Sequence, residues 1–184
     1  RTPFITIHAG SATTILAQAK RWPAVKYAQL IETLRSELPH DIVVLEGPDE
    51  SGVAGEIAGA IADTVRLHVL KRTGGLGDAA GVLERAALYA GTDSGLAHLA
   101  AAVGTRAVTI FAPADPDRVC PFGNRDLVVK PDKPCSPCFM YPWETPYPKM
   151  KCTQPFCITE ITVEQVMQKI RMALDLVPSP AARG

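Results

Sequence analysis

The stretch from Gly91 to His98 carries the residues best suited to chemistry. It reads Gly-Thr-Asp-Ser-Gly-Leu-Ala-His and follows a short apolar run that predicts a strand. Small residues at positions 91, 94 and 95 would let a ligand approach the backbone, and the first N–H groups of a helix beginning here would favour a phosphate. His98 lies four residues after Ser94 on the same helical face, where it can donate a hydrogen bond to that ligand.

A plainer interpretation of this turn is also open. Asp93 can cap the helix by accepting a backbone N–H, or it can point outward and accept a sugar hydroxyl. His98 can pack against the sheet instead of facing a ligand. The turn by itself does not decide between a ligand site and this structural role.

Four of the five cysteines form a second cluster, with Cys135 and Cys138 followed by Cys152 and Cys157. Two close pairs in a proline-rich segment can hold one structural zinc ion, which would order a segment that has little core of its own. Two disulfides or unligated thiols are the alternatives. An odd cysteine number favours a reducing compartment over a secreted disulfide scaffold, and Cys120 is predicted to be a small buried hydrophobic residue.

Hydrophobic patterning predicts the elements that position these residues. Apolar runs predict strands at 4–8, 42–45, 65–68, 88–90, 107–111 and 127–129. Helical spacing predicts helices after Pro23 and at 53–62, 76–87, 94–103 and 163–176. This alternation predicts an α/β fold, a doubly wound parallel sheet covered on both faces. Ligands bind such sheets at the carboxyl ends of the strands, near a switch in strand order, so the loops after the strands are the expected site.

Length and charge set further expectations. The 184 residues suffice for one domain, which we expect to span residues 1–177, and the start at Arg1 is interpreted as a cut at a domain boundary. Residues 112–161 are predicted to form an irregular loop rich in Cys and Pro, and residues 178–184 a disordered tail. Lys plus Arg and Asp plus Glu balance at 19 each, so no net field attracts nucleic acid.

The motifs resemble glycosyltransferase family 9. The run from Asp93 to Gly104, a strand, and then Pro113-Ala-Asp-Pro-Asp-Arg118 are similar to that family's pattern of an aspartate turn, a helical histidine and a proline-rich loop. The opening His8-Ala-Gly-Ser11 with Lys20-Arg-Trp-Pro23, and Gly47-Pro-Asp-Glu50, are similar to its first two loops. Alanine at positions 112 and 114 replaces the family's usual glycine and threonine. The match runs in order over most of the chain.

The resemblance implies a Rossmann-like domain, the C-terminal donor-binding half of a glycosyltransferase of GT-B type. Because ADP-heptose:lipopolysaccharide heptosyltransferases typify the family, it implies transfer of heptose from ADP-heptose to a lipopolysaccharide-type acceptor. The enzyme would be cytoplasmic and peripheral at the inner face of the cytoplasmic membrane. The acceptor and the catalytic base would belong to an N-terminal domain, so no catalytic residue is assigned here and the chain alone is expected to be inactive.

The same resemblance implies which residues bind the donor. Lys20 would reach the phosphates, Glu50 would accept hydrogen bonds from the ribose, and Asp93 would hold the sugar. Transfer would need no metal or other cofactor, because cations and a helix N-terminus stabilise the leaving diphosphate. The full donor-binding set is Gly10, Ser11, Lys20, Glu50, Asp93, Ser94, Gly95 and His98.

Two other functions fit the sequence. One is a non-catalytic nucleotide-binding module that kept the pocket, and the other is a nucleotide-sugar epimerase-like enzyme. For single residues, a solvated charge is the alternative at Lys20, and an exposed loop acid is the alternative at Glu50.

Overall fold

The centre of the molecule is a parallel sheet of six strands in the order β3-β2-β1-β4-β5-β6. The computed structural model describes residues 3–11, 19–47, 50, 52–71, 74–134, 136–137 and 157–175. Its strands are β1 (Phe4–His8), β2 (Asp41–Glu46), β3 (Leu67–Lys71), β4 (Leu88–Thr92), β5 (Ala107–Ile110) and β6 (Val128–Val129). The order reverses between β1 and β4, which confirms the predicted doubly wound sheet and places its switch point there.

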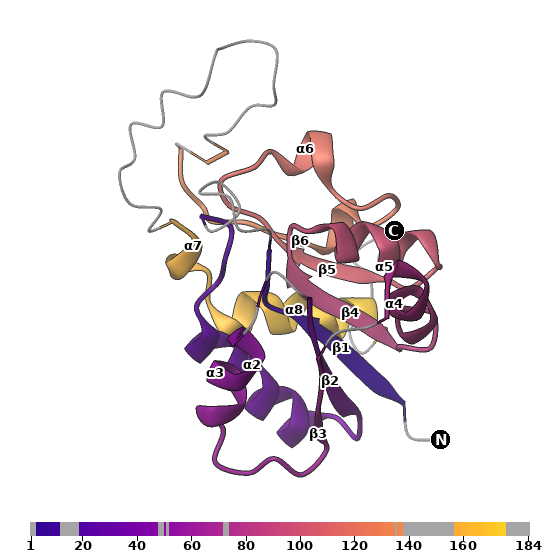
Figure 1. Cartoon of the computed structure of the whole chain (residues 1–184). Helices are drawn as coiled ribbons and strands as arrows, with labels where there is room; N and C mark the ends of the chain where they lie inside the picture. The colour runs from indigo at the N-terminus through magenta and orange to yellow at the C-terminus, as the bar shows by residue number, and fades with distance from the viewer. Residues whose placement is uncertain are drawn as a thin grey trace.

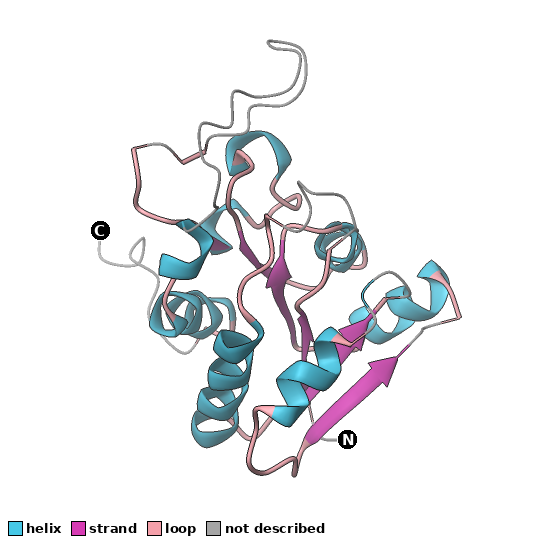
Figure 2. Ribbon diagram, turned by 60° about the vertical axis from the view of Figure 1, so that its left-hand side comes forward, coloured by secondary structure: helices cyan, strands magenta, loops and turns pink. Residues whose placement is uncertain are grey.

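Helices cover both faces of the sheet (Figures 1 and 2). On one face α2 (Ala24–Glu37) packs against α3 (Val53–Gly59) and α8 (Val163–Ala173), and on the other α4 (Leu76–Leu83) packs against α5 (Gly95–Ala102). Each face has its own hydrophobic core, because β1 and β4 are buried on both sides. Such strands appear in the sequence as nearly continuous apolar runs, which is why they were predictable.

The entry of α2 is fixed to the segment that precedes α8. Trp22 is buried with its ring edge-on to Tyr27 at 5.0 Å between centroids. Its indole N–H donates to the Ile161 carbonyl over 3.0 Å, and Lys26 Nζ donates to the same oxygen over 2.8 Å. Next to that carbonyl, Thr162 and Gln165 form a capping box at the start of α8. Trp22 therefore has a structural role, since it packs the start of α2 against the segment before α8.

Several element boundaries differ from the prediction for local reasons. The third strand begins at Leu67, two residues late, because Arg66 has φ 58 and turns the chain first. The helix α4 ends at Leu83 and not at 87, because the N–H of Ala87 already bonds to the Phe4 carbonyl of β1. The last helix stops at Ala173, just before Asp175 adopts φ 57.

The segment predicted to be irregular, 112–161, contains regular structure in its described part. It includes α6 (Pro116–Val119), a 3-10 turn (Arg125–Leu127), β6 and α7 (Cys157–Glu160). The strand predicted at 127–129 is confirmed as β6, whereas α6 and α7, with four residues each, are too short to show a helical period in the sequence. Cys120 ends α6 and is half-buried, so the prediction that it is buried was wrong. The predicted tail, 178–184, lies outside the described residues.

None of the helices within the described ranges is long and apolar enough to cross a membrane.

The pairing of β1 with β4 depends on a missing side chain at Gly91, and this can be tested. A Cβ there would lie 2.4 Å from the His8 carbonyl oxygen of the neighbouring strand. Because that oxygen belongs to a central strand that cannot move alone, we expect Gly91→Ala to lower the free energy of unfolding by about 1–3 kcal/mol. Denaturant unfolding measures this. Gly59→Ala is the control, since its Cβ would meet nothing within 4 Å; equal stability of the two variants would contradict the explanation.

Candidate functional site

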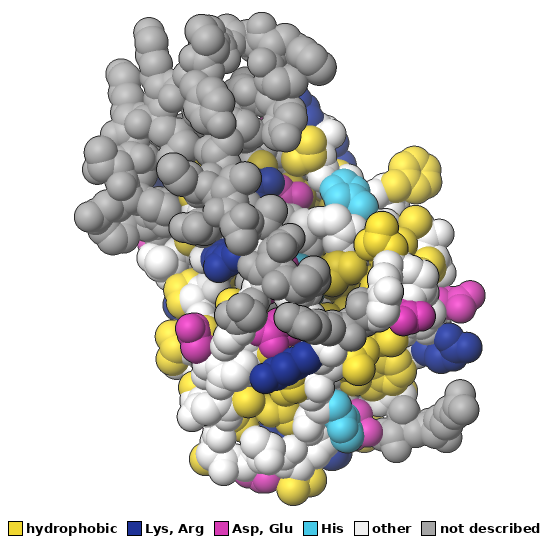
Figure 3. Space-filling model, in the orientation of Figure 1, with side chains coloured by type: hydrophobic (Ala, Val, Ile, Leu, Met, Phe, Trp, Pro, Cys, Tyr) yellow, Lys and Arg dark blue, Asp and Glu magenta, His cyan; other side chains and the backbone are white. Residues whose placement is uncertain are grey.

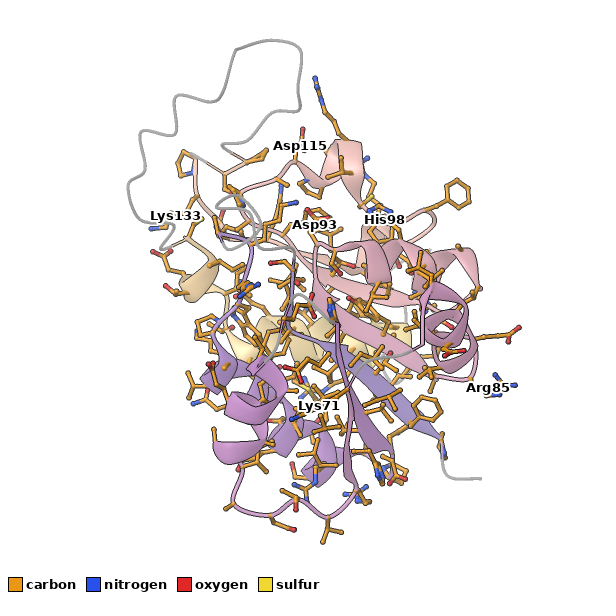
Figure 4. The ribbon with its side chains drawn as sticks, viewed as in Figure 1. Lys71, Arg85, Asp93, His98, Asp115 and Lys133 are labelled. Carbon is orange, nitrogen blue, oxygen red and sulfur yellow. The ribbon has the colours of Figure 1, made fainter. Side chains whose placement is uncertain are left out.

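A cavity of about 980 Å³ opens at the carboxyl ends of β1, β2 and β4, at the switch point of the sheet. Its polar wall is built by the loops after these strands and by the start of α5. Figure 4 shows Asp93 and His98 on this side of the molecule, whereas Arg85 points away from it. The polar lining residues are His8, Ser11, Lys20, Glu46, Gly47, Glu50, Asp93, Ser94, Gly95 and His98.

The apolar lining residues of the cavity, here called its apolar wall, come largely from α4 and α5. This wall consists of Leu45, Leu76, Ala79, Leu96, Leu99 and Ala102, with the backbone of Gly74 and Gly75 at its edge. The face of the molecule drawn in Figure 3 carries hydrophobic side chains beside scattered charges of both signs. A cleft with one polar and one apolar wall suits a ligand that joins a flat ring to charged groups.

Lys20 and Asp93 form an ion pair across the polar wall. The Lys20 ammonium donates to Asp93 Oδ2 over 2.5 Å, and Asp93 is only 7% exposed. Asp93 directly follows β4, while Lys20 precedes α2, so the pair joins the two halves of the sheet at the switch point. The carboxylate does not cap α5. Because a buried carboxylate requires a partner, this contact accounts for its charge in the unliganded site.

A buried polar cluster surrounds His8, the last residue of β1. Its Nε2 lies 2.8 Å from Glu50 Oε2, and its Nδ1 lies 3.2 Å from Ser94 Oγ and 3.3 Å from the Tyr89 hydroxyl. The two hydroxyls are 3.3 Å apart. The ring is 2% exposed. Residues from three separate loops and strands are therefore connected through one imidazole.

The charge state of Glu50 determines the protons in this cluster. Burial raises the pKa of its carboxyl, but the hydrogen bond and charge of His8, together with the Gly47 N–H, outweigh burial and lower the pKa below its ordinary value. Glu50 is thus ionised at neutral pH. Because an ionised carboxylate only accepts hydrogen bonds, His8 Nε2 must carry a hydrogen. Burial also raises the pKa of Tyr89, so its hydroxyl keeps its proton.

Gly10 makes room for Glu50. A Cβ at position 10 would lie 1.9 Å from the Glu50 carboxyl carbon, so any other residue would displace the carboxylate. Gly47 N–H donates to the same oxygen, Oε2, over 3.0 Å. The chain after β1 and the loop after β2 therefore hold this acid from both sides, and Glu50 is not an exposed loop residue.

The N-terminus of α5 is open toward the cavity. Ser94 is its N-cap residue but its side chain does not cap the helix, since its hydroxyl faces His8 and Tyr89. A Cβ at Gly95 would meet nothing within 4 Å. His98 is exposed at the cavity and is not packed against the sheet. The first N–H groups of the helix are therefore accessible to an anion.

Seven of the eight residues predicted to bind a donor line this one cavity; the exception is Gly10, which lies behind Glu50. Ser11 lines it with its hydroxyl accepting from Arg21 Nε over 3.1 Å. Sequence reasoning assigned no role to His8, to Glu46 or to the apolar residues of α5. A signal for His8 was available, since a polar residue at the buried end of the central strand is unusual. Glu46 accepts from the Gly52 N–H at the start of α3.

The predicted metal ligands are only partly described. Cys135, Cys138 and Cys152 lie outside the described residues, and Cys157 begins α7. The described flanks of this segment meet, because Lys133 Nζ and Glu160 Oε1 form an ion pair at 2.8 Å. That contact brings the two ends of the cysteine-bearing segment together.

Known proteins resemble this chain in sequence and in fold. The profile of glycosyltransferase family 9 (heptosyltransferase) matches residues 2–147. Lipooligosaccharide heptosyltransferase 2 of Haemophilus influenzae is 26% identical over 61% of this chain and 33% of its own length. Lipopolysaccharide heptosyltransferase 1 of Pseudomonas aeruginosa is 26% identical over 84% of this chain and 44% of its own. The chain thus spans less than half the length of these curated relatives.

Solved structures agree on the fold. ADP-heptose LPS heptosyltransferase II of E. coli superimposes with a TM-score of 0.71 at 22% identity, over 95% of this chain and 47% of that one. The E. coli heptosyltransferase WaaC, solved with ADP, gives 0.68 at 22% identity, over 94% and 45%. With its profile matched over most of its length and its Rossmann-like sheet shared with these enzymes, the chain belongs to glycosyltransferase family 9.

Proposed function

We propose that this chain is the donor-binding half of a heptosyltransferase-like glycosyltransferase and that its cavity takes an ADP-sugar. The observation that carries the proposal is the convergence of Lys20, Asp93 and the open N-terminus of α5 on one cleft at the switch point. The solved relative with ADP supports a nucleoside diphosphate as the ligand class. A lipopolysaccharide-type acceptor, bound by a second domain at the inner face of the cytoplasmic membrane, completes the proposal.

The proposed orientation of the donor follows from charge. The diphosphate is placed at the N-terminus of α5, where backbone N–H groups, His98 and Lys20 favour negative charge. The base is placed against the apolar wall. The two carboxylates, Glu50 and Asp93, would repel phosphate, so they are placed on the ribose and on the sugar, whose hydroxyls can donate to them.

The chain would contribute leaving-group stabilisation to transfer. Cleavage of the bond between sugar and diphosphate leaves negative charge on the phosphate oxygens. Donors fixed in advance, in a site with a buried polar wall, stabilise that charge more than water does. Lys20 can bind the diphosphate only if the diphosphate competes with Asp93 for the Lys20 ammonium. Donor binding is therefore proposed to exchange an internal ion pair for an ion pair with the ligand.

The first test is ADP binding measured by calorimetric titration, with His98 as the probe. We expect His98→Ala to weaken ADP binding by about 1–3 kcal/mol, the range for a hydrogen bond to a charged group. Its stability should hardly change, because the ring is exposed. His68→Ala is the matched control, an exposed histidine on the edge strand β3. Absence of ADP binding by the unaltered chain would reject the proposed function, and normal binding by His98→Ala would remove His98 from the site.

The second test separates sugar from nucleotide recognition at Asp93. We expect Asp93→Asn to weaken binding of an ADP-sugar about tenfold while leaving the affinity for ADP unchanged or higher, since Lys20 is released from its partner. The measurement is the ratio of the two dissociation constants in the variant and the unaltered chain. Equal losses for both ligands would show that the carboxylate serves only to hold Lys20.

For the cysteine segment we propose one structural zinc ion held by Cys135, Cys138, Cys152 and Cys157. Support comes from the Lys133–Glu160 contact, which joins the flanks of the segment and brings Cys157 near its beginning. Thiolates are the ligands that zinc prefers in structural sites.

Elemental analysis of protein purified without chelator tests the zinc proposal. We expect about one zinc per chain and five thiols that react after denaturation, because cysteines that bind zinc are thiolates and not disulfides. Cys120→Ser is the control and should keep the metal, whereas Cys138→Ser should lose it. Metal-free protein with a single reactive thiol would instead indicate two disulfides.

A further inference from the structure

His8 offers nothing to a ligand directly, although it lies at the edge of the cavity. Its ring is 2% exposed, and each of its nitrogens faces a partner within the protein. A side chain whose polar atoms are all occupied can influence a ligand only through those partners.

The contact with Glu50 leaves one carboxylate oxygen for a ligand. Oε2 accepts from both His8 Nε2, at 2.8 Å, and the Gly47 N–H, at 3.0 Å. Within the described ranges no hydrogen bond reaches Oε1. Because the carboxylate is planar, two donors on Oε2 fix the direction in which Oε1 points. Removing the imidazole would leave a carboxylate held by a single backbone donor.

The contact with Ser94 fixes the residue on which α5 begins. With Nε2 bonded to Glu50, Nδ1 faces the hydroxyls of Ser94 and Tyr89, and either hydroxyl can share a hydrogen bond with it. Both hydroxyls are within 3.3 Å of it. The N-cap side chain is thereby turned away from the helix N–H groups, which remain open to an anion.

We propose that His8 is a positioning residue that couples two ends of the donor cleft, holding Glu50 toward the ribose with one ring nitrogen and Ser94 beside the diphosphate with the other. The inference rests on the proposed function. Among the described residues, no hydrogen bond joins Glu50 directly to Ser94. The imidazole of His8 therefore links the loop after β2 to the start of α5.

The test compares two ligands that differ only in the ribose hydroxyls, ADP and 2′,3′-dideoxy-ADP, by calorimetric titration of the whole 184-residue chain. We expect the unaltered chain to prefer ADP about tenfold, the effect of hydroxyls bonded to a charged group. Glu50→Gln should abolish that preference. His8→Leu should reduce it about as much, although His8 contacts no ribose, and should also weaken dideoxy-ADP severalfold through Ser94.

Two further variants separate positioning from general stability. Thr105→Val removes a buried hydrogen bond, from Thr105 Oγ1 to the Leu83 carbonyl at 2.6 Å, outside the cavity lining. It should lower stability and leave the ADP preference unchanged. His8→Gln keeps a side-chain donor and should preserve more of the preference than His8→Leu. If the leucine variant does not fold, the ring signals of His8 in NMR spectra of the unaltered chain replace it, and they should shift more with ADP than with the dideoxy ligand.

The outcomes are distinct. A folded His8→Leu with the full preference for ADP, or with equal losses for both ligands, overturns the coupling and leaves the proposed function intact. A glutamine variant no better than leucine, or ring signals that respond equally to both ligands, also overturns it. An unaltered chain that binds neither nucleotide rejects the proposed function as well.

Discussion

The contact between β1 and β4 at the middle of the sheet is the constraint on which the other features depend. These strands carry the chain in opposite directions after they end, β1 toward α2 and β4 into α5, so a cleft must open between their carboxyl ends. Two threonines connect the strands beyond the backbone ladder: Thr6 donates to the Leu88 carbonyl and Thr92 donates to the Gly10 carbonyl. With the floor of the cleft fixed in this way, its walls can carry charged groups without collapsing onto each other.

Because the polar wall is buried, each of its charged side chains requires a partner within the protein. Asp93 and Glu50 are both largely removed from water. Lys20 pairs with Asp93, and both His8 and the Gly47 N–H contact Glu50. An isolated carboxylate at such a depth would be neutralised or would destabilise the fold. The unliganded site therefore holds both carboxylates in contacts within the protein. We expect a ligand to be recognised by how well its own groups replace or extend those contacts. Its affinity would then depend on the positions of its hydroxyls and phosphates more than on its net charge.

The sequence was sufficient to predict a helix or strand where its hydrophobic period matches the side of the element that is buried. The buried strands β1, β2, β4 and β5 and the helix α2, with Tyr27, Ile31 and Leu34 on one face, were predictable because their patterns reflect a single environment. The prediction was weaker where a local backbone conformation sets the start of an element, as at Arg66, or where a segment is too short to show a period, as in α6. For the site, the spacing of motifs placed seven residues in one cleft. The role of Gly10 and the partners of His8 were not readable, because both depend on contacts between loops far apart in sequence.

The ion pair between Lys133 and Glu160 has a consequence for how this family can vary. It holds together the two ends of a long connection, while α8, which follows, is fixed independently by its packing against α2 and β5. A connection with anchored ends behaves as a closed loop, and doubling the length of such a loop adds only about 0.6 kcal/mol of closure entropy. Insertions and deletions between these anchors should thus leave the sheet and its cleft undisturbed.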